Sequence, residues 1–184
     1  GFFAWVIPSG TGVGKIGVAG RDINASGTIE KFLKSMGRYS TIRKIFAPIW
    51  IKGPIKEFIS KDIVIAGDAA GQSKPTTAGG IYSCGIGGIM AGQAVGEYLE
   101  THKLFHLQQY KKSWDDKFGR EFEKQRLARK ILERIDNNTI DKIFGTITPD
   151  ILSEISDNDN FDFHAASIVK LLGIRKSLIR PRPI

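Results

Sequence analysis

The sequence predicts a mixed fold of the α/β (α+β) class, in which strands and helices share the first part of the chain and the remainder is helical. Two observations predict it. Before residue 102, β-branched and aromatic runs alternate with glycine-rich turns, which is the pattern of short strands. After residue 102, glycine becomes rare, charged residues become frequent, and aromatic residues recur at a spacing of four, which is typical of helices with one buried face.

A β-hairpin is expected at the start of the chain. Residues 2–8 are a β-branched and aromatic run that ends at a proline, and residues 15–20 are the expected partner strand after a glycine-rich turn. Residues 45–55 are predicted to be an edge strand, because proline within a sheet is tolerated only at its edge.

Three short helices are expected, one in the first part of the chain and two near its end. One covers residues 26–37, with Ser26 or Thr28 as its N-cap. Two others are predicted at 148–156 and 162–173. From residue 104 onward the chain is expected to be mostly helical, with a core face formed by an aromatic stripe: Tyr110, Trp114, Phe118 and Phe122.

A strand followed by a long helix is expected in the middle of the chain. Residues 61–67 begin with a charged pair and continue as a short uninterrupted run rich in β-branched residues. This pattern predicts a strand buried on both faces. It ends before Asp68, and a helix is expected to begin near Gly79 or Gly80 and to continue to about Glu100.

Composition excludes several classes of protein. With 41% hydrophobic and 25% charged residues, the chain is neither disordered nor fibrous. The net charge of +8 favours anionic partners, but only residues 174–184 are basic without acids, and no RNA- or DNA-binding motif is present. Nucleic-acid binding is therefore not expected. The single cysteine, Cys84, excludes an intrachain disulfide and indicates a reducing compartment.

Three familiar motifs are present only in part. Residues 12–17 match G-x-G-x-x-G, but no helix can begin after them, so a dinucleotide phosphate site is not expected there. The acidic run 157–162 departs from a calcium loop at its fifth, sixth and twelfth positions. His102 and His106 have the spacing of two metal ligands without a third. No metal site is expected.

A ridge of small residues is expected along the helix after Gly79. Such a ridge lets a helix backbone lie close to a flat partner, such as a sheet or a ring. It also matches a transmembrane dimer motif. The segment is only weakly apolar, however, so a buried helix of a soluble protein is the favoured interpretation. The ridge consists of Gly80, Cys84, Gly88, Gly92 and Gly96.

The candidate ligand-binding groups lie at the junction between the strand at 61–67 and the next helix. Asp68 follows the strand, at the sheet edge where α/β proteins bind ligands, and can accept hydrogen bonds from a sugar or polyol. Gly79, Gly80 and Ile81 begin a helix whose free N–H groups favour a negative or electron-rich ligand atom. A reduced flavin has both a polyol arm and an anionic ring edge. A tight strand-to-helix connection without a ligand is the alternative.

At this point the sequence resembles the geranylgeranyl reductase family, flavoproteins related to p-hydroxybenzoate hydroxylase. Residues 63–81, IVIAGDAAGQSKPTTAGGI, are similar to the family's second flavin motif, Gly-Asp-Ala-Ala-Gly followed by Pro-Thr-Thr-Gly-Gly-Gly-Ile. Ala78 stands where the family usually has Gly, which is expected to shift the loop slightly. The family's N-terminal G-x-G-x-x-G unit has no counterpart here, so the chain is expected to be the C-terminal part of a larger enzyme.

The resemblance implies FAD as the cofactor. Asp68 would bind the ribityl or pyrophosphate arm, residues 75–77 would line the isoalloxazine ring, and the backbone N–H groups of Gly80 and Ile81 would contact its pyrimidine edge. The proton donor stays unidentified, because Tyr82 and Cys84 are expected to serve packing. The full set of implied cofactor-binding residues is Gly67, Asp68, Pro75, Thr76, Thr77, Gly79, Gly80 and Ile81.

Residues 3–8 resemble the family's substrate-side motif, Tyr-x-Trp-x-Phe-Pro. Phe3, Trp5, Ile7 and Pro8 fall on it and would hold an isoprenoid chain over the ring. Phe3 replaces Tyr and Ile7 replaces Phe, and both changes leave the pocket apolar.

The function that the resemblance implies is FAD-dependent reduction of isolated C=C bonds in geranylgeranyl chains of membrane lipids. Residues 1–58 would be a mostly β portion of the substrate-binding domain, 59–102 the last segment of the FAD-binding domain, and 103–184 a helical region. The implied partners are an isoprenoid lipid substrate and an electron donor, either reduced nicotinamide or ferredoxin. A cytoplasmic protein in peripheral contact with the inner face of the cell membrane is expected, and this fragment alone would be inactive.

Two other interpretations stay open. The Gly-Asp motif is shared by related flavoproteins, so a monooxygenase, a halogenase or a quinone-linked dehydrogenase is one alternative. The other is a non-enzymatic, membrane-interacting helical protein that uses Gly88–Gly96 as a dimer face.

Overall fold

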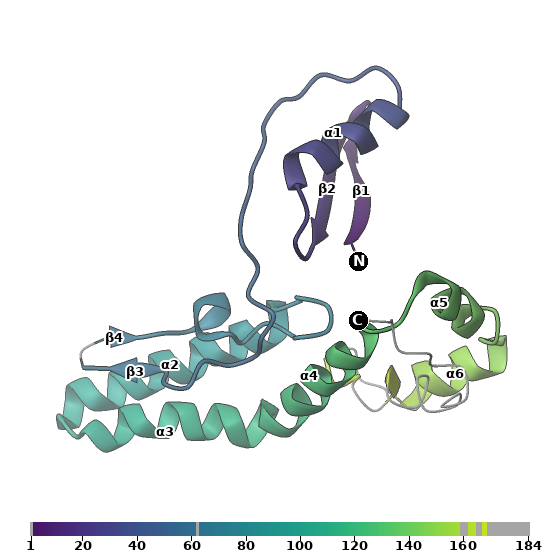
Figure 1. Ribbon diagram of the computed structural model, residues 1–184. Helices are drawn as coiled ribbons and strands as arrows, with labels where there is room; N and C mark the ends of the chain where they lie inside the picture. Colours follow the sequence, from purple (N-terminus) through teal and green to yellow (C-terminus); the bar gives the residue numbers. More distant parts are fainter. Residues whose placement is uncertain (1, 62, 159–161, 165–166, 169–184) are drawn as a thin grey trace. The chain divides into compact units, whose positions relative to one another are not determined.

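The computed structural model describes residues 2–61, 63–158, 162–164 and 167–168, and they belong to two compact units (Figure 1). The division falls between Ala47 and Pro48. Each unit has its own secondary structure, and each is described by itself. The mixed α+β class and the helical character of the later part of the chain are confirmed.

Unit 1 is a hairpin followed by a helix. Strand β1 (Phe2–Gly10) pairs antiparallel with β2 (Val13–Gly20), with Trp5 opposite Gly17, so the predicted hairpin is confirmed. Helix α1 covers Ala25–Ser35. The predicted N-caps, Ser26 and Thr28, are wrong.

The N-cap of α1 is Asn24, whose Oδ1 accepts a hydrogen bond from the N–H of Gly27 at 3.0 Å. An asparagine side chain reaches the amide three residues on as well as a serine does, and it satisfies one of the first-turn donors. The helix therefore begins earlier than predicted.

Unit 2 begins with an irregular segment, so the edge strand predicted at 45–55 is wrong. None of these residues is in a strand. Pro48 and Pro54 have no N–H to donate to a ladder. The segment is held instead by the Trp50 indole N–H, which donates to the carbonyl of Gly53 at 2.6 Å, and by Ile55 N–H, which donates to Ala70 at 3.0 Å.

The sheet of unit 2 is smaller than predicted. Strand β3 (Ile59–Ser60) pairs antiparallel with β4 (Ile63–Val64). The expectation of a strand buried on both faces is wrong, because 63% of Ile63 is exposed. Within the described residues β4 has one neighbouring strand, and a two-stranded ribbon cannot cover its own faces.

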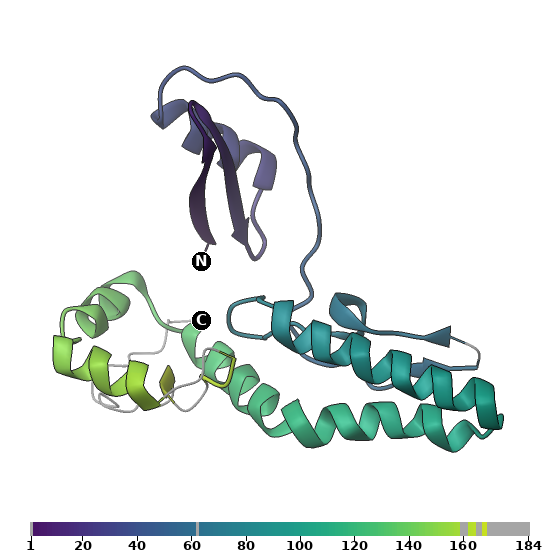
Figure 2. The same cartoon turned by 180° about the vertical axis from the view of Figure 1, so that it is seen from behind.

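Helices dominate the rest of unit 2. The long helix expected from Gly79 or Gly80 and the helical stretch beyond residue 104 are confirmed, and α2 and α3 run side by side in both views (Figures 1 and 2). A helix near 148–156 is confirmed as well, whereas most of the helix predicted at 162–173 lies outside the described residues. The bounds are η1 Gly67–Ala70, α2 Ile81–Thr101, α3 Leu104–Trp114, η2 Asp115–Gly119, α4 Arg120–Leu132, α5 Asn137–Phe144 and α6 Pro149–Asn158.

The aromatic stripe is confirmed as the core of unit 2. Tyr110, Trp114, Phe118 and Phe122 are each at most 2% exposed, and Phe58 packs on Trp114 from the segment before β3. A spacing of four drifts around an α-helix, which has 3.6 residues per turn. The π-helical turn η2 between α3 and α4 is wider, and this keeps the stripe on one face.

Helix α2 buries a different face from the predicted ridge. An added Cβ at Gly88, Gly92 or Gly96 would meet no atom within 4 Å. The prediction that these three glycines pack closely against a partner is therefore wrong for the described residues. The buried residues are Ser83, Gly87, Ala91 and Ala94, which lie about one residue earlier around the helix.

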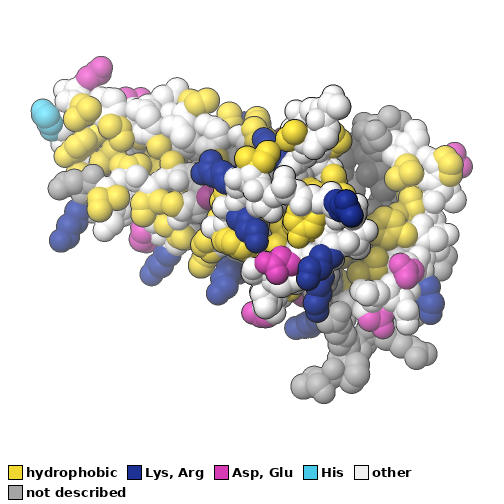
Figure 3. Space-filling view, turned by 90° about the horizontal axis from the view of Figure 1, so that it is seen from above, with side chains coloured by type: hydrophobic (Ala, Val, Ile, Leu, Met, Phe, Trp, Pro, Cys, Tyr) yellow, Lys and Arg dark blue, Asp and Glu magenta, His cyan; other side chains and the backbone are white. Residues whose placement is uncertain are grey.

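Hydrophobic side chains lie exposed along the helical part of unit 2 (Figure 3). Ile89 and Leu99 of α2 are each more than half exposed. Even so, the described part of the chain contains no helix that combines the length and the hydropathy of a transmembrane span.

Candidate functional site

The structure brings Asp68 next to the beginning of α2. A Cβ added to Gly80 would lie 3.3 Å from Asp68 Oδ1 and only 2.7 Å from Cys84 Sγ. Any residue larger than glycine at position 80 would therefore collide with the site. The carboxylate after the strand and the glycine before the helix therefore lie next to each other.

The Asp68 carboxylate is held through one of its oxygens. The hydroxyl of Ser73 and, at 3.5 Å, the thiol of Cys84 both donate to Oδ1. Ser73 is 2% exposed, whereas Asp68 is exposed. Among the described residues no donor is found for Oδ2. The carboxylate is thus oriented by protein contacts and keeps an acceptor oxygen for a ligand hydroxyl.

The first turn of α2 offers backbone N–H groups. Its N-cap is Gly80, which has no side chain to cap the first-turn amides, and the Ile81 side chain is 99% exposed. Such amides, together with the helix dipole, favour a negative or electron-rich ligand atom.

Buried Gln72 fixes the loop that carries Asp68. Its Oε1 accepts a hydrogen bond from Gly67 N–H at 2.7 Å, and its Nε2 donates to the Tyr110 hydroxyl at 2.8 Å. Its carbonyl accepts from Ser83 Oγ at 2.6 Å. The Tyr110 hydroxyl in turn donates to the carbonyl of Ile65 at 3.1 Å. Gln72 therefore joins η1, α2 and α3 at the base of the site. Sequence analysis missed this role, although Gln72 lies within the motif.

The loop from Lys74 to Gly79 closes on itself. Lys74 N–H donates to Gly79 O at 2.9 Å, and Ala78 N–H donates to Lys74 O at 2.8 Å. Ala78 has φ of +59°, a left-handed conformation that favours glycine, which accounts for the glycine in the motif that it resembles. Of the residues predicted to line a ring, Thr77 is exposed, Thr76 is half-buried and Pro75 is fully buried.

Burial raises the pKa of the Cys84 thiol. The neighbouring Ser73 hydroxyl opposes this rise, while the Asp68 carboxylate adds to it. The pKa of Tyr110 is also raised, first by burial. Both side chains are therefore neutral hydrogen-bonding groups near neutral pH.

The predicted substrate-side residues lie on β1 of unit 1. Phe3, Trp5 and Ile7 alternate along the strand and share one face, with exposed fractions of 60%, 36% and 51%. The rings of Phe3 and Trp5 are 5.6 Å apart, and the Trp5 ring lies over Gly17 of β2. Pro8 is exposed and pairs with Gly14. These residues form an open apolar surface.

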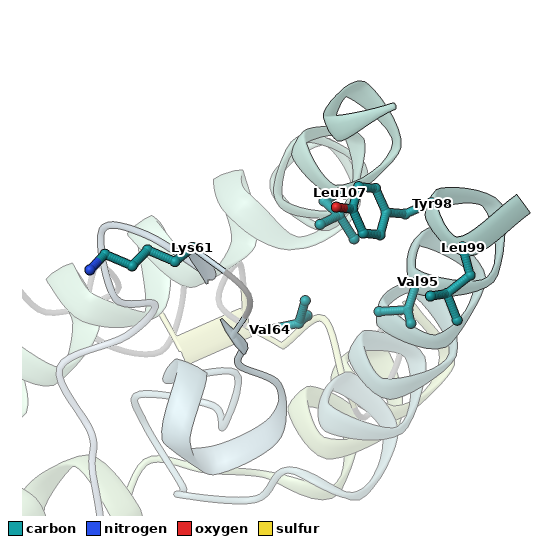
Figure 4. A pocket seen from close by; sticks show the side chains of 6 residues that line it. All are labelled: Lys61, Val64, Val95, Tyr98, Leu99 and Leu107. Carbon is teal, nitrogen blue, oxygen red and sulfur yellow. The ribbon is translucent and has the colours of Figure 1, made fainter. Parts of the chain in front are cut away.

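Two cavities lie within unit 2. One of about 160 Å³ is formed between the β3–β4 turn, the second half of α2 and the start of α3 (Figure 4). Val64, Val95 and Leu107 point into it, whereas the Lys61 ammonium points away. The other, of about 170 Å³, is lined by apolar residues of α4, α5 and the segments beside them. Each is smaller than the usual pocket of a cofactor.

Titratable residues of the described chain form no group of three that could hold a metal ion. His106, from the predicted histidine pair, has its Nδ1 2.7 Å from Glu97 Oε2. His102 ends α2 in a left-handed conformation.

Comparison with known proteins identifies relatives along most of the chain. An uncharacterized protein of Methanocaldococcus jannaschii is 28% identical over 93% of this chain and 46% of its own length. Digeranylgeranylglycerophospholipid reductase 2 of Methanothermobacter thermautotrophicus is 27% identical over 84% of this chain and 42% of its own. The digeranylgeranylglycerophospholipid reductase of M. jannaschii is 29% identical over 78% of this chain and 39% of its own.

The chain thus spans less than half the length of the curated relatives that it matches. No protein-family profile matches it, and neither does any solved structure. The resemblance found in the sequence is nevertheless confirmed: this chain is related to the digeranylgeranylglycerophospholipid reductases.

Proposed function

We propose that the chain is part of an FAD-dependent oxidoreductase that reduces isolated C=C bonds in the geranylgeranyl chains of membrane lipids. The observation that carries the proposal is the meeting of the Asp68 carboxylate with the uncapped start of α2 at Gly80. The names of the relatives support the class of reaction and the lipid substrate.

The residues at the start of α2 fit a flavin. Asp68 Oδ2 would accept a hydrogen bond from the polyol arm, because Oδ1 is already held by Ser73 and Cys84. The amides of Gly80 and Ile81 would face the pyrimidine edge of the ring, with Gly67 and Gly79 shaping the backbone on either side. Residues 75–77 would border the ring, through Thr77 and the backbone rather than through the buried Pro75 ring.

The chemistry divides between the cofactor and the chain. A bound flavin would supply the hydride to one carbon of the double bond, and a separate donor would supply a proton to the other. The α2 amides and the helix dipole would stabilise negative charge on its ring edge, which favours the reduced form. Phe3, Trp5, Ile7 and Pro8 would bind the isoprenoid chain through apolar contacts. A reduced nicotinamide or a ferredoxin would supply the electrons.

The proposal includes the arrangement of the whole protein. Residues 1–58 would belong to the substrate-binding domain, 59–102 to the FAD-binding domain and 103–184 to a helical region. The protein would be cytoplasmic and bind the inner face of the membrane peripherally, since its net charge of +8 favours an anionic surface.

The test is flavin binding by the polypeptide that carries this chain in the cell. Purified wild-type protein should be yellow and retain FAD through gel filtration. Asp68→Ala should lower FAD affinity at least about tenfold, because a hydrogen bond to a charged group contributes roughly 1.5–3 kcal/mol. Asp116→Asn, at an exposed carboxylate of η2, is the matched control and should bind FAD as the wild type does.

A colourless wild-type protein that ignores added FAD would overturn the flavin proposal. The substrate is tested separately, by incubating the reduced holoenzyme with digeranylgeranylglycerophospholipid and following saturation of its double bonds by mass spectrometry. FAD retention without lipid reduction would redirect the proposal to another flavoprotein of the superfamily.

A further inference from the structure

The loop beside the proposed ring site is attached to residues far along the chain. Lys74, Pro75 and Thr76 each bond to the C-terminal half of unit 2. None of these bonds closes the loop itself, because its closure is made by its own backbone hydrogen bonds. Three consecutive attachments therefore point to a role in fixing where the loop lies.

The first attachment is an ion pair. Lys74 is 3% exposed, and its Nζ lies 2.9 Å from Asp162 Oδ1. Burial of a cation is costly unless an opposite charge accompanies it. The contact therefore ties the loop to the segment at 162–164, whose Phe163 ring stacks on Phe118 of the core with centroids 5.7 Å apart.

The second attachment is a chain of hydrogen bonds with a fixed direction. Gln125 Nε2 donates to Glu121 Oε1 at 2.9 Å, which leaves Gln125 Oε1 as an acceptor. Thr76 Oγ1 donates to that oxygen at 3.2 Å. Because the Thr76 hydrogen is used there, His164 Nε2, at 2.8 Å from Thr76 Oγ1, is the donor to the hydroxyl. The Thr76 side chain is thus turned toward α4 and His164.

The third attachment is made by Arg129 of α4. One of its guanidinium nitrogens, Nη1, donates to the carbonyls of Pro75 and Thr76 at 3.2 and 3.4 Å, while Nε pairs with Glu133 at 3.0 Å. A guanidinium held at both ends is a rigid support for a backbone.

We propose that Gln125, Arg129, Asp162 and His164 are positioning residues that hold the Lys74–Gly79 loop in place for the flavin ring. This inference rests on the proposed function. It makes attachment of the segment at 162–164 a condition for tight ring binding, although none of its residues is among those assigned to the cofactor. Loss of an attachment would release the loop and weaken contact between the ring edge and the amides of Gly80 and Ile81.

Four variants test the proposal in the complete protein. His164→Leu removes the donor to Thr76, and His164→Gln supplies an amide donor in its place. Asp162→Asn removes the charge opposite Lys74 while keeping the side-chain shape. Lys130→Gln, at an exposed position next to Arg129, is the matched control.

Two readouts are used. Hydrogen exchange of the Ala78 and Gly79 amides, measured without cofactor, reports whether the loop is released. FAD affinity and the midpoint potential of the bound flavin report the ring site. We expect faster exchange and at least about tenfold weaker FAD binding in His164→Leu and Asp162→Asn. The potential should become more negative, because the amides stabilise the reduced ring less.

His164→Gln should restore much of the wild-type behaviour, and Lys130→Gln should match the wild type. Unchanged amide exchange in both loop-releasing variants would overturn the proposal, and so would a released loop with unchanged FAD affinity and potential. If His164→Leu does not fold, Asp162→Asn carries the test alone. Failure of the wild type to bind FAD would instead overturn the proposed function, so the two failures are distinguishable.

Discussion

The loop before α2 and the hairpin of unit 1 are built in opposite ways. The loop is held by side chains from far along the sequence: Gln72 bonds to Tyr110, and Thr76 bonds to Gln125 and His164. The hairpin face is held by strand pairing and by contacts among its own side chains, and its Phe3 and Ile7 side chains are more than half exposed. The difference teaches that a polar site needs its hydrogen-bonding groups held in fixed orientations. An apolar surface needs only a matching shape, and its side chains can adjust to a bound molecule.

The largest contrast is expected from truncating an aromatic residue in each region. Trp114→Ala should lower the free energy of unfolding by about 3–5 kcal/mol, because Trp114 is fully buried in the core below the loop. Phe3→Ala should lower it by less than about 1 kcal/mol, since most of the ring is already in water. Urea unfolding followed by circular dichroism measures both, and equal losses would remove the contrast.

A smaller effect is expected where α2 approaches Gln72. A Cβ at Gly87 would lie 2.1 Å from Gln72 Oε1, and moving that amide breaks its bonds with Gly67 and Tyr110. Gly87→Ala should therefore lower the free energy of unfolding by about 2–4 kcal/mol. Gly88→Ala, which meets open space on the same helix, should raise it by about 0.5–1 kcal/mol. An unchanged free energy of unfolding in Gly87→Ala would mean that the hydrogen bonds of Gln72 do not fix its side chain.

The same substitution in the hairpin should be tolerated better. A Cβ at Gly17 would lie 2.0 Å from the Trp5 ring, but that ring is 36% exposed and can rotate away without leaving a buried polar group unpaired. Gly17→Ala should change the free energy of unfolding by less than about 1 kcal/mol, because alanine also favours the strand over glycine. The indole N–H resonance of Trp5 should shift. A loss as large as that of Gly87→Ala would contradict the adaptable hairpin face.

Ala78 tests backbone strain within the loop. Its φ of +59° is unfavourable for any residue with a Cβ. Ala78→Gly should therefore raise the free energy of unfolding by about 0.5–1 kcal/mol. Ala91→Gly, in the regular helix α2, should lower it instead. Thermal unfolding distinguishes the two signs, and a destabilised Ala78→Gly would show that the loop needs no left-handed residue at position 78.

The smallest effect concerns pH. Burial raises the pKa of Cys84 above its ordinary value of 9.0, so the folded state keeps the thiol proton after the unfolded state has begun to lose it. The contribution of the thiol to stability is therefore complete below pH 9 and declines as pH rises beyond 9. Cys84→Ala should make the decline in unfolding free energy between pH 8 and 10 shallower than in the wild type, where Tyr110 adds a decline of the same sign. If the unfolding free energies of the wild type and Cys84→Ala declined in parallel with pH, burial would not raise the pKa of Cys84.

Local patterns in the sequence were sufficient for the hairpin, for the start of α2 near Gly80, and for the aromatic stripe as a core face. Each depends on neighbours within one element: alternation along a strand, a helix start after glycine, and side chains that recur on one helix face. The sequence also indicated that Asp68 and the helix start near Gly80 belong to one site, whereas their contact depends on how the segment between β4 and α2 folds. The relation to the digeranylgeranylglycerophospholipid reductases followed from the ordered motif at 63–81.

Tertiary structure alone decided which face of α2 is buried and how the loop is held. The predicted ridge at Gly88–Gly96 is open, because the neighbouring face is the buried one: Gly87 lies against Gln72, and Ala91 belongs to the hydrophobic core. Likewise, no periodicity links Lys74 to Asp162 or Thr76 to His164, which are 88 residues apart. Contacts between distant segments depend on the packing of several elements at once, and a pattern within one segment carries no information about them.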